Sequence, residues 1–88
     1  MEVTGLSNKA GIIVKRMSLG NQPYEFTFTY GQGHWYADIR YAGSLIRAGL
    51  RVCSGRVLLE TTEGKLYPGD DVSMTGFNKV VWYETEDL

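Results

Sequence analysis

Strict two-residue alternation in the middle of this sequence constrains the fold more than any other feature. In the run Tyr24–Tyr30 (YEFTFTY) every aromatic residue falls on one side and Glu25, Thr27 and Thr29 fall on the other. Side chains alternate between the two faces of a strand, so this pattern is typical of a half-buried β-strand. The run His34–Ala42 (HWYADIRYA) repeats the alternation after Gly31–Gly33, which we interpret as a three-residue loop. The sequence therefore predicts a β-hairpin over residues 24–41, with its aromatic face in the core.

The rest of the chain breaks into similarly short segments, with eleven glycines spread along it. No segment longer than about ten residues has helical periodicity. We expect an all-β fold of about six or seven short strands, arranged as a small antiparallel barrel or a two-layer sandwich. The expected strands outside the hairpin are Gly11–Arg16, Ser44–Arg47 and Leu50–Cys53 around a bulge near Gly49, Arg56–Thr62, Lys65–Tyr67 and Asn78–Glu84.

Between these segments we expect turns at Met17–Pro23 with Gly20-Asn21 at the centre, Ala42–Ser44, Ser54-Gly55, Glu63-Gly64 and Pro68–Asp71. A chain of 88 residues is expected to form one domain, residues 1–88, with flexible tails at 1–10 and 84–88.

The small size of the chain bears on how it is stabilised. Apolar burial in so short a domain barely offsets the entropy of ordering it, and disulfides, metals or oligomerisation commonly make up the difference. Cys53 is the only cysteine and His34 the only histidine, so one chain forms neither a disulfide nor a Cys/His zinc site. By elimination, we expect a homo-oligomer.

Charge and hydropathy exclude several classes of protein. The formal net charge is −1 at pH 7, far from the strong positive field that attracts nucleic acid. There is no apolar run of about 18 residues to cross a membrane, and the N-terminus does not resemble a signal peptide. We therefore expect a protein that stays in the cytoplasm where it is made, with Cys53 reduced.

A search for reactive groups predicts no catalytic, cofactor-binding or metal site. We interpret His34 as an exposed turn histidine and Cys53 as a small buried hydrophobe, because neither has a partner in the local pattern. The adjacent Asp70 and Asp71 supply too few oxygens for calcium and are typical of a loop. Gly31-Gln32-Gly33 lacks the lysine and helix of a phosphate-binding loop.

Four arginines lie close together in the sequence, at Arg40, Arg47, Arg51 and Arg56. With Tyr36 and Tyr41 interleaved, they resemble the platform on which small barrels bind single-stranded nucleic acid. A solvated strand face, or salt bridges across a subunit interface, is the simpler explanation. Nucleic-acid binding is therefore the alternative hypothesis, followed by an antitoxin-like or regulatory binding module.

The order of the segments resembles the baseplate plug family of contractile-tailed bacteriophages. The similarity covers roughly Tyr24–Tyr83 and consists of the aromatic strand, the glycine hairpin, Trp35–Ile39, Gly43, Gly55–Leu59, a turn with proline and acidic residues at Leu66–Asp71 and a final apolar strand at Val80–Tyr83. The resemblance implies a small non-enzymatic β protein in the virion, without a cofactor, that closes or joins the tail tube at the hub. It also implies several copies bound to tube and hub proteins, assembled in the host cytoplasm.

Five apolar residues are candidates for such contacts. The two runs that contain them are apolar on both faces, whereas a half-buried strand in a lone domain has one polar face. The candidates are Ile12, Ile13, Val14, Val80 and Trp82. Either a second subunit covers them or the strands lie inside the domain.

Overall fold

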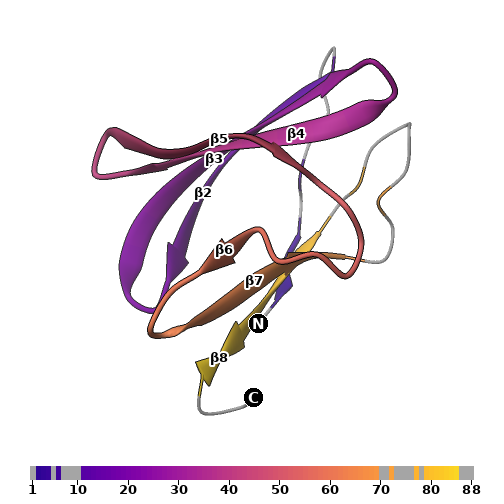
Figure 1. Cartoon of the computed structure of the whole chain (residues 1–88). Coiled ribbons are helices and arrows are strands. Elements are labelled where there is room, and N and C mark those ends of the chain that lie inside the picture. The colour runs from indigo at the N-terminus through magenta and orange to yellow at the C-terminus, as the bar shows by residue number, and fades with distance from the viewer. Residues whose placement is uncertain are drawn as a thin grey trace.

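Two four-stranded antiparallel sheets face each other in the computed structural model (Figure 1), which describes residues 2–4, 6, 11–69, 72, 77 and 79–85. This confirms the predicted all-β class and takes the form of a two-layer sandwich. No helix in those ranges is long and apolar enough to span a membrane. The strands are β1 (Glu2–Val3), β2 (Ile12–Leu19), β3 (Gln22–Gly31), β4 (His34–Tyr41), β5 (Ser44–Arg51), β6 (Leu59–Glu60), β7 (Gly64–Pro68) and β8 (Val80–Glu84).

The two sheets differ in how the chain builds them. One has the order β2-β3-β4-β5, so each strand pairs with the next one along the chain. The other has the order β1-β8-β7-β6, and it pairs the first strand with the last through Glu2↔Val81 and Val3↔Val80. Glu2 and Val3 were expected in a flexible tail, and Glu84, also expected there, is the last residue of β8.

The predicted central hairpin is confirmed in position. Strands β3 and β4 pair from Tyr24↔Tyr41 to Gly31↔His34. The connection is shorter than the predicted three-residue loop, because Gly31 belongs to the strand and only Gln32 and Gly33 form the turn. Both turn residues have positive φ, 53° and 84°, as two-residue hairpin turns of type I′ require.

Strand β2 continues through residues that we predicted to be a turn. Met17, Ser18 and Leu19 pair with β3 up to Leu19↔Gln22, and the turn contains only Gly20 and Asn21, with φ of 57° and 63°. Met17 and Leu19 face the core. The apolar period of the strand therefore outweighs the loop-like composition of the segment.

The predicted bulge near Gly49 is confirmed. The pairing of β4 with β5 shifts register between Ala37 and Ile39 and again between Ile39 and Arg40. Gly49 has φ of +65°, and its N–H donates a hydrogen bond of 2.9 Å to Asp38 Oδ1. The Asp38 carboxylate thus accepts a hydrogen bond from the Gly49 N–H, at the place where the regular pairing of β4 with β5 is interrupted.

The later strands are shorter than predicted. Only Leu59–Glu60 of the expected Arg56–Thr62 strand is a strand, although Leu58 N–H still donates to the Leu66 carbonyl at 2.7 Å. Gly64 begins β7 instead of belonging to a turn. The Ser54-Gly55 turn is confirmed, with Gly55 at φ +81°. The predicted loop residues Asp70 and Asp71, and Asn78 of the closing strand, lie outside the described residues.

An aromatic cluster fills the space between the sheets. Phe28 stacks on Phe26 at a centroid distance of 5.8 Å, and Phe77 packs edge-on against Phe28 at 5.0 Å and Trp35 at 5.6 Å. These rings are at most 5% exposed. The aromatic side of the predicted hairpin therefore packs in the core between the two sheets. The other face of that sheet lies on the surface of the protein.

Replacing Ala42 by asparagine is expected to stabilise the protein by about 1 kcal/mol. Ala42 has φ of +51° in the β4–β5 turn, a left-handed conformation that costs an L-residue with an ordinary side chain roughly 1–2 kcal/mol but that asparagine adopts readily. Urea unfolding at one low protein concentration measures the gain. Ser44→Asn, one residue beyond the turn in extended chain, is the control and should bring no gain.

Candidate interaction surface

The outer face of the β2–β5 sheet is formed by the residues that alternate with the core. Cross-strand pairing arranges them in rows, such as Ile12–Thr29–Tyr36 and Val14–Thr27–Asp38. Among the described residues no strand covers this face, because the second sheet packs on the opposite side (Figure 1). The face thus combines aliphatic, hydroxyl and charged side chains and is open to a partner.

Strand β2 is the edge of this sheet and has two large aliphatic side chains on its surface. Ile12 is 48% exposed and Val14 is 60% exposed. Tyr30 N–H donates to the Gly11 carbonyl at 2.8 Å, so by the alternation of antiparallel pairs the N–H and C=O groups of Ile12 and Val14 point away from β3. This edge presents both apolar side chains and backbone hydrogen-bonding groups.

The five apolar candidates divide into two groups. Ile13, Val80 and Trp82 are at most 2% exposed and belong to the core between the sheets of this one chain. Ile12 and Val14 alone lie on the surface. The apolar run of β2 therefore serves two faces of the strand. Ile13 faces the core, whereas Ile12 and Val14 face the open outer side of this edge strand.

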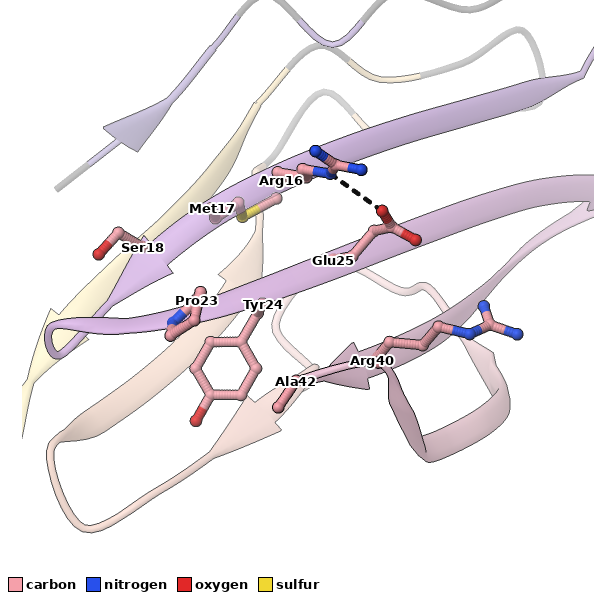
Figure 2. Close-up of a pocket in the computed structure, with 9 residues that line it drawn as sticks. Arg16, Met17, Ser18, Pro23, Tyr24, Glu25, Arg40 and Ala42 are labelled. Carbon is pink, nitrogen blue, oxygen red and sulfur yellow. Dashed lines mark hydrogen bonds and ion pairs between the residues drawn. The ribbon is translucent and has the colours of Figure 1, made fainter.

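A row of alternating charges crosses the outer face next to a hollow. Arg16 Nε lies 3.1 Å from Glu25 Oε2, and Arg40 is the cross-strand partner of Glu25 on its other side. Figure 2 shows Arg16 and Glu25 pointing toward each other, with Arg40 extended away and the Tyr24 ring on the opposite side of the strand. The hollow measures about 470 Å³ and is lined by Arg16, Met17, Ser18, Pro23, Tyr24, Glu25, Arg40, Ala42 and Gly43.

The structure only partly gathers the four arginines of the nucleic-acid hypothesis. Arg40 shares the outer face with Arg51, which pairs with Tyr36. Asp38 lies on the same face between their rows. Arg47 is an exposed residue of β5, and Arg56 is exposed in the bend after the Ser54-Gly55 turn. An acidic residue therefore interrupts the basic patch that this hypothesis needs.

The β4–β5 hairpin ends in a segment exposed on both faces, which we call the arm and define as residues 41–49. Every residue of the arm is exposed, including Leu45 at 50% and Ile46 at 43%. Figure 1 shows this hairpin end projecting at the left, away from the second sheet. Composition does not distinguish the arm from a buried strand, so the sequence alone does not predict its exposure.

The outer face of the second sheet carries a pair of tyrosines, which were not among the sequence candidates. Tyr67 and Tyr83 pack edge-on with centroids 5.8 Å apart. They line a hollow of about 440 Å³ with Val81 and Pro68. Alternation along the closing strand, with Val80 and Trp82 inward, could have identified Val81 and Tyr83 as outward-facing. We call Tyr67, Val81 and Tyr83 the tyrosine face.

His34 and Cys53 line one shallow hollow of about 300 Å³. His34 faces Tyr36 on the outer side, and Cys53 is partly exposed instead of buried as expected. No hydrogen bond joins the two in the described part of the chain, so the geometry of an activated thiol is not present there. The same residues contain no cluster of three or more His, Cys, Asp or Glu suited to a metal ion.

The phenol of Tyr24 should make the stability of the fold depend on pH in the alkaline range. Burial raises the pKa of Tyr24 above its ordinary value of about 10, and the neighbouring Tyr41 and Glu63 raise this pKa further. The unfolded chain therefore loses this proton first, and the folded state loses stability as pH rises from about 10 to the raised pKa. We expect Tyr24→Phe to remove that part of the high-pH decline, measured by urea unfolding at pH 8 and pH 11. An unchanged decline would contradict the assignment.

The fold and its surfaces define a two-sheet antiparallel sandwich with exposed apolar and charged faces. The family described as cyanophage baseplate Pam3 plug gp18 matches residues 11–85. The chain belongs to this family of phage baseplate plugs, as the resemblance over Tyr24–Tyr83 predicted. No curated protein and no solved structure matches the chain.

Proposed function

We propose that this protein is a non-enzymatic structural component of a phage tail baseplate, which closes or joins the end of the tail tube at the hub. It works in several copies, binds tube and hub proteins, and is assembled into virions in the host cytoplasm. The family match over residues 11–85 is the observation that carries the proposal. The arrangement of exposed surfaces supports it.

A plug must keep its shape while it contacts neighbours on several sides. The aromatic core between the sheets provides a rigid centre. The surfaces provide the contacts, with exposed aliphatic residues at the β2 edge, an exposed arm and a tyrosine face. Exposed apolar groups of this kind mark interaction sites in small proteins.

Deleting the gene from the phage that encodes it, and supplying the protein from a plasmid, tests the proposed role. We expect particles without functional baseplates in the deletion, and normal particles with the plasmid. Antibody labelling in electron microscopy should then place the protein at the baseplate end of the tail. Infectious virions that contain no copy of the chain by mass spectrometry would overturn the proposal.

Replacing Val14 by aspartate should reduce incorporation into virions without unfolding the protein. Val14 is 60% exposed on the β2 edge, so the change should alter stability by no more than about 0.5 kcal/mol. A charge at this edge opposes both apolar docking and strand pairing. Quantitative mass spectrometry of purified particles gives the result. Ser18→Asp, on the same face of the same strand, is the matched control and should be incorporated normally.

A further inference from the structure

The outer edge of β2 is a long and regular strand edge. Strand β2 pairs with β3 over its whole length of 8 residues, from Ile12↔Thr29 to Leu19↔Gln22, without a shift of register. In the described part of the chain, β3 is the one strand that pairs with it. The N–H and C=O groups of alternate residues, beginning with Ile12 and Val14, therefore point away from the sheet. A row of such backbone groups is a template for a further strand.

The opposite edge of the same sheet is built differently. Strand β5 pairs with β4 through two shifts of register. Gly49 has φ of +65°, and its N–H donates to Asp38 Oδ1 at 2.9 Å. Irregularities of this kind bend an edge and oppose the addition of another strand. The chain thus protects the β5 edge against strand pairing and leaves the β2 edge suited to it.

The side chains along the β2 edge are apolar at its start and charged farther on. Ile12 is 48% exposed and Val14 is 60% exposed, and both lie on the outer face of the sheet. Lys15 and Arg16 follow them directly. Exposed edge strands commonly carry lysine or proline in place of large aliphatic residues. The apolar half of this edge therefore has the composition of a strand that is paired in its working state.

A second copy of the same strand, running antiparallel, fits this half of the edge. Only the even-numbered residues direct their backbone groups outward, so the paired residues of both copies must be even-numbered. With Ile12 opposite Val14 of the second copy, a two-fold axis passes beside Ile13, and each of the two equivalent pairs exchanges two hydrogen bonds. The four aliphatic side chains then lie next to one another on the outer face. Lys15 lies opposite Gly11, which has no side chain to oppose it.

Charge favours this register over those farther along the strand. A slip of two residues would place Ile12 opposite Arg16 and would separate the aliphatic residues of the two copies. A slip of four residues would place Lys15 opposite Lys15 of the second copy, and like charges directly opposite each other are destabilising. The first register avoids both conflicts. The edge is therefore complementary to itself, which is the property that a two-fold contact requires.

We propose that β2 of one copy pairs antiparallel with β2 of a second copy, with Ile12 opposite Val14. The two four-stranded sheets then form one continuous sheet across the two-fold axis. The inference rests on the proposed function in several copies, and it names the surface that joins two of them. A contact of this kind closes after two copies. The arm and the tyrosine face stay available for tube and hub proteins.

Cysteine crosslinking tests the register on the full chain with Cys53→Ser as background. Ile12→Cys and Val14→Cys are made as separate variants. Residues that form a hydrogen-bonded antiparallel pair have Cα atoms about 5.5 Å apart, within the range of a disulfide. Mixed in equal amounts and oxidised, the two variants should form a covalent dimer with one chain of each, as shown by mass spectrometry. Each variant alone should form several-fold less, because equal residues are then diagonal neighbours roughly 7–8 Å apart.

Val14→Pro tests whether the contact is made through the backbone. Proline removes the outward N–H of residue 14 and leaves the hydrogen bonds to β3 intact, because odd-numbered residues of β2 make those. By size-exclusion chromatography with light scattering, the wild-type chain should form a concentration-dependent dimer. Val14→Pro should have the mass of a single chain and the wild-type circular dichroism spectrum. Ser18→Pro changes the same kind of outward position beyond the paired residues, so this control should keep the dimer.

Several outcomes would overturn the inference. These are a wild-type chain that stays monomeric at its highest soluble concentration, a dimer that survives Val14→Pro, or a mixture that does not crosslink. A covalent dimer of Val14→Cys alone would show the slipped register and contradict the pairing of Ile12 with Val14. If the wild-type chain is monomeric while antibody labelling places it at the baseplate, the strand pairing fails and the baseplate role stands. A dimeric chain that infectious virions lack would show the reverse.

Discussion

Phe28→Ala is expected to reduce the free energy of unfolding by about 3–5 kcal/mol. The Phe28 ring is fully buried, stacks on Phe26 and receives the edge of Phe77 at 5.0 Å. Removing it takes away its apolar contacts and leaves a cavity between the two sheets. A domain of this length has a total stability of roughly 4–13 kcal/mol, so the variant should be close to unfolding at room temperature.

Urea unfolding followed by tryptophan fluorescence measures this loss, because Trp35 lies beside the same cluster. Thr29→Ala is the matched control, since Thr29 is the next residue of β3 and faces solvent on the outer side. The control should change stability by no more than about 0.5 kcal/mol. A Phe28→Ala loss below about 1 kcal/mol would mean that the aromatic face does not form the core.

The central hairpin could be predicted from the sequence because its signals are local. Alternation over Tyr24–Tyr30 and over His34–Tyr41 places aromatic and aliphatic residues on one face. The glycines near residues 20, 33 and 43 mark two-residue turns, in which positive φ is required at both positions. Each of these signals depends on residues a few positions apart, and the structure confirms the strand pair that was predicted from them, the hairpin of residues 24–41.

The second sheet could not be predicted to the same extent, because its pairs join distant segments. Glu2 pairs with Val81 across nearly the whole chain, and no local pattern indicates a strand as short as β1. The segment Arg56–Thr62 has strand-like composition, yet only Leu59–Glu60 is a strand. Propensity in this segment is overridden by tertiary contacts.

The interaction surface was predictable only in part for the same reason. Ile12 and Val14 were candidates because the run that contains them is apolar on both faces, and the structure places them on an open sheet edge. The arm and the tyrosine face depend on which strands the second sheet covers. Sequence alternation identifies the two faces of a strand, but the arrangement of layers decides which face is exposed.

Gly64→Ala should reduce the free energy of unfolding by about 3 kcal/mol, through crowding instead of a cavity. Gly64 is the buried first residue of β7 and pairs with Glu84. A Cβ atom at this position would collide with the Tyr83 carbonyl oxygen and would lie 2.7 Å from Trp82 Cζ2. The carbonyl belongs to the backbone of β8, so it cannot rotate away as a flexible side chain would.

The position of Gly64 makes this variant informative about assembly as well as folding. The crowded atoms lie directly before Glu84 and under Tyr83, so a displaced β8 would also disturb the tyrosine face. Gly31→Ala is the matched control, because no atom lies within 4 Å of a Cβ built there. The control should be neutral or stabilising by about 0.4–1 kcal/mol, since alanine lowers the entropy of the unfolded chain. Equal urea midpoints for the two variants would show that β8 does not pack closely against Gly64.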